Sequence, residues 1–221
     1  TPEEYLFTTA DDSDTKEYIL LKNVNANAGD GFFVMTNGYT ERGIPYDTNP
    51  HGASDSDRKG TKTEQSLVYD VDRNGSIAQR LNADSYIEEH FPLMKNYINT
   101  HTWYTEQGYG LDSYRTNCKI SLLSVTEYAV NYDRIGYKPN GENMQWWLRS
   151  PHKDIITYSI WEFLPTGVIN NAWNLNSTYA NRVVRPCFYL NVEFFKNVKL
   201  DVSKMGDEVK RVIRDTVNYN D

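Results

Sequence analysis

The sequence predicts an α+β protein in which β-strands at both ends of the chain enclose a helical middle part. Three observations support this: β-rich runs fill the first third, capping signals for short helices fill the middle, and the last third returns to β-rich runs. Strands that precede and follow the helices, instead of alternating with them, favour an α+β fold over a doubly wound parallel sheet.

The first third contains two expected strands and a long polar stretch. The β-rich runs at residues 16–24 and 31–36 are separated by turn-forming Asn, Gly and Asp residues. Residues 37–63 are rich in Gly, Pro, Asp and Ser and show little periodicity, so we expect a long surface loop. Loops of this length in a compact domain are usually functional or mobile.

Capping signals in the middle of the chain predict several short helices. A serine precedes a Gln or Glu by three residues at Ser76, Ser85 and Ser124, which is the spacing of a capping box. Pro92 fits the first turn of a further helix over residues 92–99, because its missing N–H is no loss there. Residues 118–128, CKISLLSVTEY, are expected to form a buried strand and then the start of a helix.

The last third is expected to return to strands and then to end in a helix. The candidate strands are residues 146–150, 156–164, 168–173 and 183–190, with a turn at 165–167. Residues 204–215 form an amphipathic pattern with Met205, Val209, Val212 and Ile213 on one face. We therefore expect a domain over residues 1–195 and an extension over 196–221, whose helix docks on the domain or on a neighbour.

Composition excludes several classes of function. The 221 residues are enough to bury one substantial core. A net charge of −7 argues against a nucleic-acid partner, which would require clustered Lys and Arg. No run of eighteen apolar residues predicts a membrane span. The chain opens at TPEEYLF, without Met and without a basic and apolar leader, so we expect a processed chain or a piece of a longer one.

Residues 158–181 have the composition of a recognition surface. They contain five Asn, two Trp, two Tyr and two Ser between the stiffer strings QWWLRSP and RVVRPCFYL. Aromatic side chains supply contact area at low entropic cost, and short polar side chains supply adaptable hydrogen bonds. The predicted ligand-binding residues are Tyr158, Trp161, Asn170, Asn171, Trp173, Asn174, Asn176 and Tyr179.

Several other motifs admit both a functional and a structural interpretation. Arg149 and Arg185 lie next to prolines in apolar strings, where they would clamp a carboxylate or phosphate or else satisfy buried carbonyls or an acidic partner. Adjacent strand residues face opposite sides, so one of Trp146 and Trp147 is expected in the core and the other beside a cleft. Residues 70–77 match the start of a calcium loop but lack its final Glu, so a turn before a Ser76-capped helix is the alternative.

The two cysteines and four histidines carry little signal. Cys118 and Cys187 lie in apolar strings, which favours buried free thiols, with a disulfide between core strands as the alternative. Two cysteines cannot build a four-thiolate metal site. The histidines show no ligand-like spacing, and a solvated state is expected for each. We predict no catalytic residue, no metal and no cofactor.

The ordered motifs ILLKN, QRLN, ISLLSVTEY, WWLRSP and VRP resemble a bacterial family of unknown function that is common in surface proteins of gut Firmicutes. That family is related to the C-type lectin-like fold, in the branch of formylglycine-generating enzymes and sulfatase-modifying factors. The resemblance covers roughly residues 16–190. It implies a compact mixed fold with short helices, antiparallel strands and long irregular loops, and a ligand surface built late in the chain.

The chain departs from the active members of these families. It lacks the Glu-Pro-Asn, Gln-Pro-Asp and Trp-Asn-Asp motifs of calcium-dependent lectins, because Leu175 follows Trp173-Asn174. Some C-type lectin-like proteins are diversified by retroelements that enrich a late segment in Asn, Tyr and Ser. Residues 170–181 resemble such a hypervariable segment, with a codon bias of the genome as the alternative.

These observations predict a non-catalytic module of a secreted or cell-surface bacterial protein that binds a glycan or a protein. It is expected to have neighbouring domains in a longer surface protein, and no nucleic-acid partner or membrane insertion. The alternatives are a diversified receptor-binding protein, a spacer domain of an adhesin, and an oxidase-like enzyme of the formylglycine-generating branch, with Cys118 and Cys187 close together beside a cleft.

Overall fold

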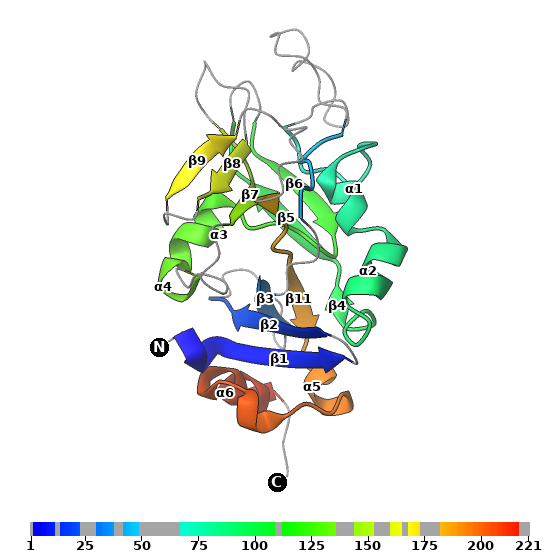
Figure 1. Ribbon diagram of the computed structural model, residues 1–221, viewed down its shortest axis with the longest axis vertical. Coiled ribbons are helices and arrows are strands. Elements are labelled where there is room, and N and C mark those ends of the chain that lie inside the picture. Colours follow the sequence, from blue (N-terminus) through cyan, green and yellow to red (C-terminus); the bar gives the residue numbers. More distant parts are fainter. Residues whose placement is uncertain are drawn as a thin grey trace, which may run out of the picture.

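The computed structural model is a mixed α+β fold with antiparallel sheets and short helices, as the sequence predicts (Figure 1). It describes residues 2–11, 14–22, 30–37, 42–48, 67–108, 112–135, 144–152, 160–164, 168–172 and 182–216. No helix within these ranges is long and apolar enough to cross a membrane.

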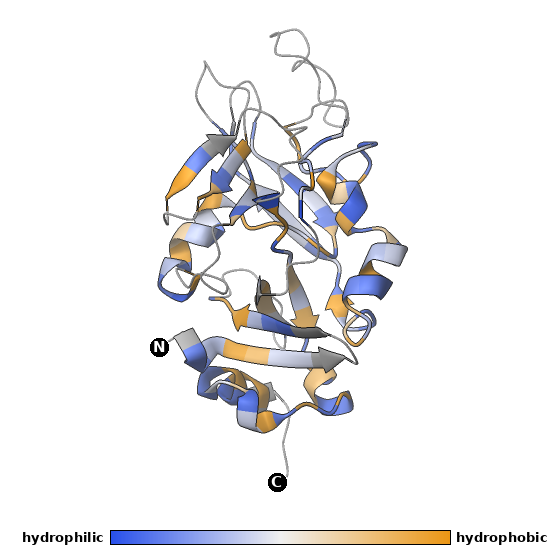
Figure 2. Ribbon diagram, viewed as in Figure 1, coloured by the Kyte–Doolittle hydropathy of each residue, from blue (hydrophilic) through white to orange (hydrophobic). Residues whose placement is uncertain are grey.

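The largest sheet joins the two ends of the domain. Its order is β1-β2-β3-β11-β4, and its strands are Leu6–Asp11, Asp14–Leu20, Asp30–Asn37, Cys187–Asn191 and Ile98–Asn99. The central pair, β3 and β11, is antiparallel, with Phe33 opposite Phe188. Hydrophobic residues on β1, β2 and β11 are visible in Figure 2. The sequence therefore predicted β2, β3 and β11, and the early and late strands meet in one sheet.

Two smaller sheets complete the strand content of the described residues. One has the order β10-β7-β8-β9, formed by Arg182–Val183, Gln145–Pro151, Ile160–Phe163 and Ile169–Ala172. The other pairs β5 (His101–Thr105) with β6 (Tyr114–Cys118). The antiparallel β8–β9 hairpin forms one edge of its sheet, and Figure 1 places it at the end of the molecule opposite α6.

The helices are short and lie around the sheets. They are η1 (Pro2–Tyr5), α1 (Ile77–Leu81), α2 (Asp84–His90), α3 (Val125–Val130), α4 (Tyr132–Ile135), α5 (Glu193–Asn197), η5 (Val202–Lys204) and α6 (Asp207–Thr216). The predicted amphipathic helix corresponds to α6, and it docks on the domain. Met205, Val209 and Ile213 belong to the same buried cluster as the strands, and the Gly206 N–H donates to the Leu6 carbonyl.

Two of the three predicted capping boxes form a cap. Ser124 accepts from the Glu127 N–H while the Glu127 carboxylate accepts from the Ser124 N–H, each at 3.0 Å. Ser76 caps α1 by accepting from the Gln79 N–H at 3.1 Å. The prediction for Ser85 is wrong: α2 begins at Asp84, after Ala83, which makes no side-chain cap. Matching spacing is insufficient when an earlier residue already starts the helix.

We expect Ser124→Ala to lower the free energy of unfolding by about 1 kcal/mol, because it removes the cap of α3. The matched control is Ser85→Ala, which removes an exposed hydroxyl from α2 and is expected to change stability by less than about 0.5 kcal/mol. Urea unfolding followed by tryptophan fluorescence measures both. Equal effects of the two substitutions would contradict this assignment of the caps.

Two further local predictions are wrong. Residues 92–97 form turns that lead into β4 and not a helix. Residues 119–123 form no regular strand, although Ser121 makes an isolated bridge with Cys187. The reason for the second error is a side chain: the Asn82 carboxamide accepts from the Lys119 and Ile120 N–H groups and donates to the Ile120 carbonyl. It replaces the partner that a neighbouring strand would have supplied.

The predicted surface loop at 37–63 contains a buried segment. Within the described residues 42–48, Tyr46 and Asp47 are fully buried, and Ile44 is nearly so. Asp47 forms a buried ion pair with Arg73 at 2.5 Å. The segment covers one face of β7, because the Trp147 indole N–H donates to the Ile44 carbonyl at 2.7 Å and its ring contacts Tyr46. Trp146 and Trp147 are therefore both in the core, and the prediction that one lines a cleft is wrong.

Candidate functional site

The predicted late ligand surface lies partly within the described structure. Trp161 is on β8 and half-buried, and its ring lies 4.2 Å from that of His152. Asn170 is exposed on β9, and Asn171 pairs with Trp161 in the register of the two strands. The remaining predicted residues, Tyr158, Trp173, Asn174, Asn176 and Tyr179, lie outside the described residues. The described part is therefore a polar edge strand beside one partly accessible indole.

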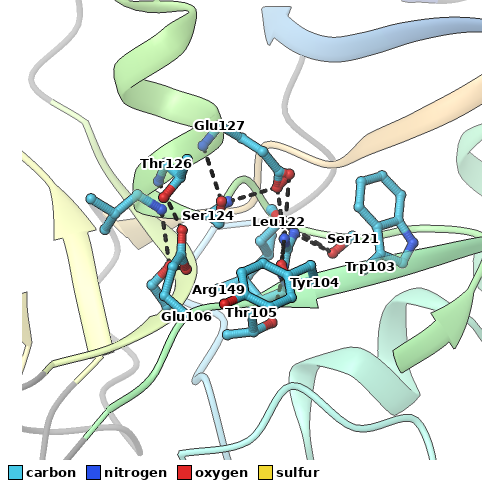
Figure 3. Close-up of polar contacts among 12 residues, drawn as sticks. Trp103, Tyr104, Thr105, Glu106, Ser121, Leu122, Ser124, Thr126, Glu127 and Arg149 are labelled. Carbon is cyan, nitrogen blue, oxygen red and sulfur yellow. Dashed lines mark hydrogen bonds and ion pairs between the residues drawn. The ribbon is translucent and has the colours of Figure 1, made fainter. Parts of the chain in front are cut away.

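Arg149 is the centre of a second, more extensive arrangement (Figure 3). Its guanidinium is buried, and its Nε, Nη1 and Nη2 atoms donate to acceptors from three segments of the chain. The acceptors are Thr105 Oγ1 at 2.9 Å, Ser121 Oγ at 3.0 Å, the Leu122 carbonyl, the Tyr104 carbonyl at 2.6 Å and Glu127 Oε1 at 2.7 Å. A guanidinium has five N–H groups, so all of them are used.

The sequence allowed Arg149 either to clamp a ligand or to satisfy buried carbonyls and an acidic partner. These contacts support the second, structural role. Burial alone lowers the pKa of its guanidinium, but the carboxylate of Glu127 and the other nearby acceptors together raise that pKa, so the group stays charged. Because no N–H group is left over, Arg149 cannot clamp a carboxylate or phosphate from outside in this conformation.

Arg185 also has a structural position. Its Nε donates to the Met35 carbonyl at 2.9 Å, and its guanidinium lies 4.4 Å from the centre of the Trp146 ring. Burial lowers the pKa of this guanidinium to about 10, although Tyr128 and Glu17 act in the opposite direction. Its buried Nη2 atom has no hydrogen-bond partner in the described part of the chain.

The start of α3 is held by side chains from neighbouring segments. The first three N–H groups of the helix donate to Ser150 Oγ at 2.9 Å, Glu106 Oε1 at 3.0 Å and Ser124 Oγ at 3.0 Å. The Ser150 hydroxyl in turn donates to Glu106 Oε2. Helix N-termini leave such groups without intrahelical partners, so α3 is fixed against β5 and β7 by these contacts.

Hydrogen bonds keep the Glu106 carboxylate ionised. Burial alone raises its pKa, but hydrogen bonds from Ser150, Thr126 and backbone N–H groups outweigh burial and lower the pKa below its usual value. All of these donors are neutral. Among the described residues, no lysine, arginine or histidine forms an ion pair with Glu106.

A pocket of about 150 Å³ opens between β5, α3 and the end of β2. Aromatic side chains form one wall and polar or charged side chains form the other. The lining residues are Lys22, Phe32, His101, Thr102, Trp103, Tyr104, Glu106, Ser124, Thr126, Glu127, Val130, Asn131, Arg149 and Tyr189. Small-molecule sites typically combine apolar walls with a few fixed polar groups, so this pocket is a candidate binding site.

The aromatic wall is ordered by stacking. The His101 ring stacks on Tyr189 at 3.8 Å and contacts Trp103 at 4.8 Å, and the Phe32 ring also stacks on Tyr189, at 4.6 Å. Burial and the charge of Arg149 lower the pKa of His101, so this imidazole is neutral at pH 7. The expectation of solvated histidines is therefore wrong for His101, and also for His90, whose side chain is only 12% exposed.

The cysteines are buried free thiols, as the sequence favours. Burial raises the pKa of Cys118 to about 12 and raises that of Cys187 as well, so both remain protonated at neutral pH. Neither lines the pocket between β5 and α3. Protonated and buried thiols are poor nucleophiles and poor metal ligands.

The calcium-like motif at residues 70–77 forms a turn. The Asp70 carboxylate accepts from the Asp72 N–H at 3.0 Å, the Ser76 hydroxyl donates to the Asp70 carbonyl, and Gly75 adopts a φ of 84°. Within the described ranges, no group of three or more His, Cys, Asp or Glu residues is placed to hold a metal ion. The contacts fit the alternative of an Asn-Gly turn that leads into the Ser76-capped helix.

Sequence reasoning identified Glu127 and Arg149 but missed the pocket and Glu106. Glu127 was identified from its spacing to Ser124, and Arg149 was identified as an arginine inside an apolar string. The pocket combines residues from β3, β5, α3, β7 and β11 with Lys22, which follows β2, and no local sequence pattern predicts that combination.

Comparison with known proteins gives one match. A family model described as "Domain of unknown function (DUF6273)" matches residues 74–192, which is more than half of the chain. The matched region includes every pocket residue except Lys22 and Phe32. No curated protein and no solved structure matches the chain significantly. The chain belongs to the DUF6273 family of domains of unknown function.

Proposed function

We propose that this chain is a non-catalytic ligand-binding module of a secreted or cell-surface bacterial protein. The observation that carries the proposal is the pocket between β5 and α3, where an aromatic wall faces the carboxylates of Glu106 and Glu127. Arg149 and the capped start of α3 hold these groups rigidly, which lowers the entropic cost of binding. A glycan or a protein would supply the ligand.

The scaffold proposed for this module is C-type lectin-like. The mixed architecture with short helices, small antiparallel sheets and long connections agrees with what the WWLRSP and VRP motifs imply. The late part of the chain also contributes to the proposed ligand surface. Ser150 holds Glu106 at the pocket, and His152, two residues later, stacks on Trp161 of the β8–β9 hairpin. This short connection links the pocket to Trp161 on the β8–β9 hairpin.

The alternatives have weaker support. An oxidase-like enzyme of the formylglycine-generating branch requires cysteines beside an open cleft, whereas Cys118 and Cys187 are buried with raised pKa values. A spacer domain of an adhesin requires no pocket. A diversified receptor-binding protein stays a separate hypothesis, because most of residues 170–181 lie outside the described structure.

A combined glycan and peptide array tests the proposal. We expect hits for the unmodified chain that are lost in Tyr104→Ala, because Tyr104 lines the pocket and is 47% exposed. The matched control is Tyr132→Ala, which removes a tyrosine of similar exposure that does not line the pocket. Hits that survive in both Tyr104→Ala and Trp161→Ala would show that the ligand binds elsewhere, and an array without hits would remove the proposal.

A further inference from the structure

The guanidinium, indole and ammonium donors of the pocket between β5 and α3 are used within the protein. Every Arg149 N–H group is used, and the Trp103 indole N–H donates to the Cys118 carbonyl at 3.0 Å. The Lys22 ammonium is held by Asp133 at 2.9 Å and by the Val130 carbonyl at 3.2 Å. The Asn131 amide donates to the Glu127 carbonyl at 3.0 Å. A phosphate or a carboxylate therefore finds no unused guanidinium or indole N–H group here.

Acceptor capacity remains at the same site. Glu127 Oε2 receives only one long contact, 3.3 Å from Arg149 Nη2, although a carboxylate oxygen accepts two hydrogen bonds. The Glu127 side chain is 22% exposed and lines the pocket, so this oxygen is within reach of a ligand.

One of the two carboxylates that line the pocket has no cationic partner among the described residues. Arg149 is paired with Glu127, and Lys22 is paired with Asp133. Glu106 is ionised but is held by neutral donors alone, so one negative charge has no counter-ion within the described residues. His101 is neutral at pH 7 and does not compensate it. A partly buried carboxylate of this kind is stabilised by an incoming cation.

The opposite wall suits a cation with an apolar stem. His101 stacks on Tyr189 and meets Trp103 edge to face, so these three rings form the aromatic part of the lining. Tyr104 also lines the pocket, but the Arg115 guanidinium already lies 5.6 Å from the centre of its ring. Aromatic faces attract ammonium groups and pack against methylene groups. A cavity of about 150 Å³ holds a molecule the size of benzene, which has more heavy atoms than a butylammonium group.

We propose that this pocket binds an alkylammonium group, the chemistry of a lysine side chain, between the Glu106 and Glu127 carboxylates and the rings of His101, Trp103 and Tyr189. The inference rests on the proposed ligand-binding function and specifies its ligand as a protein with an exposed lysine. A neutral sugar fits less well, because it carries no positive charge to pair with the Glu106 carboxylate, which only neutral groups hold.

The test uses n-butylammonium chloride at pH 7, with binding followed through the indole N–H signals of the chain by NMR. We expect saturable binding with a Kd on the order of millimolar, which is typical of so small a ligand. The neutral analogue 1-butanol and the anionic analogue butyrate are expected to bind roughly tenfold or more weakly. Glucosamine serves as the amino-sugar probe and is expected to bind more weakly than butylammonium.

The Glu106→Gln variant tests how much the negative charge of Glu106 contributes to butylammonium binding. Glutamine keeps the size of the side chain and can still accept from the Thr126 N–H, and we expect it to weaken butylammonium binding roughly tenfold. The matched control is Glu88→Gln, which removes an exposed carboxylate of α2 and should leave the Kd unchanged. A circular dichroism melt of each variant separates unfolding from loss of binding.

Several outcomes would overturn the inference. These are equal binding of butanol or butyrate, tighter binding of glucosamine, an unchanged Kd in Glu106→Gln, or no binding of butylammonium. Array hits that depend on Tyr104, combined with any of these outcomes, would leave the ligand-binding function standing and remove only the alkylammonium assignment. Array failure together with the absence of butylammonium binding would remove both.

Discussion

Arg149→Met is expected to lower the free energy of unfolding by about 3–5 kcal/mol. The substitution keeps most of the side-chain volume but removes all five donors of a buried cation. Glu127 is then left partly buried without its counter-charge, and the hydroxyls and carbonyls around it lose their donor. The cost of unpaired buried groups exceeds the cost of the lost packing, so this is one of the two largest effects expected in the chain.

Equilibrium urea unfolding measures this effect. Two further variants show whether the loss comes from the charge, the shape or the burial of the arginine. Arg149→Lys keeps the positive charge but not the planar fork, so we expect a loss between that of Arg149→Met and the unmodified chain. Arg211→Met removes an arginine whose ion pair with Glu208 is exposed on α6, and less than about 1 kcal/mol is expected. Similar losses for Arg149→Met and Arg211→Met would contradict the central role of the Arg149 network.

The Arg149 network shows which part of the site the sequence can predict. The Ser124–Glu127 cap is local, since both partners lie within one helical turn, and its spacing predicts it correctly. Arg149 could be recognised as a buried, paired charge from its apolar neighbours alone. Its partners Thr105 and Tyr104 could not, because they come from β5 and are brought to it only by the packing of β5 against β7.

The errors in the predicted fold also arise from contacts between segments that are far apart in the sequence. Local sequence patterns predicted β2, β3, β7 and α3, because the three strands are β-rich runs and the helix carries its own capping box. Residues 119–123 have the composition of a strand, but the Asn82 side chain binds their backbone groups from a different part of the chain. One of Trp146 and Trp147 was expected beside a cleft, but both are buried. The segment at 42–48 that covers Trp147 comes from a stretch whose composition indicates a loop.

Glu162→Met and Arg182→Met are each expected to lower the free energy of unfolding by about 3 kcal/mol, whereas the double variant is expected to lose less than either single variant. The two side chains form a buried ion pair, with 3.0 Å between Arg182 Nε and Glu162 Oε2. Each single substitution leaves the other charge buried without this partner. The double substitution removes both charges and replaces them with apolar groups of similar length, so the desolvation cost of the pair is also removed.

A double-mutant cycle by urea unfolding measures this coupling, and it bears on the proposed function as well as on stability. The pair connects β10 to β8, the strand that carries Trp161, and the Arg182 guanidinium also lies 4.6 Å from the centre of the Trp147 ring. We therefore expect the single variants to loosen the β8–β9 hairpin, which faster amide hydrogen exchange in β8 would reveal. Losses that simply add in the double variant would show that the two side chains act independently, and the ion pair would then not be what holds the hairpin in place.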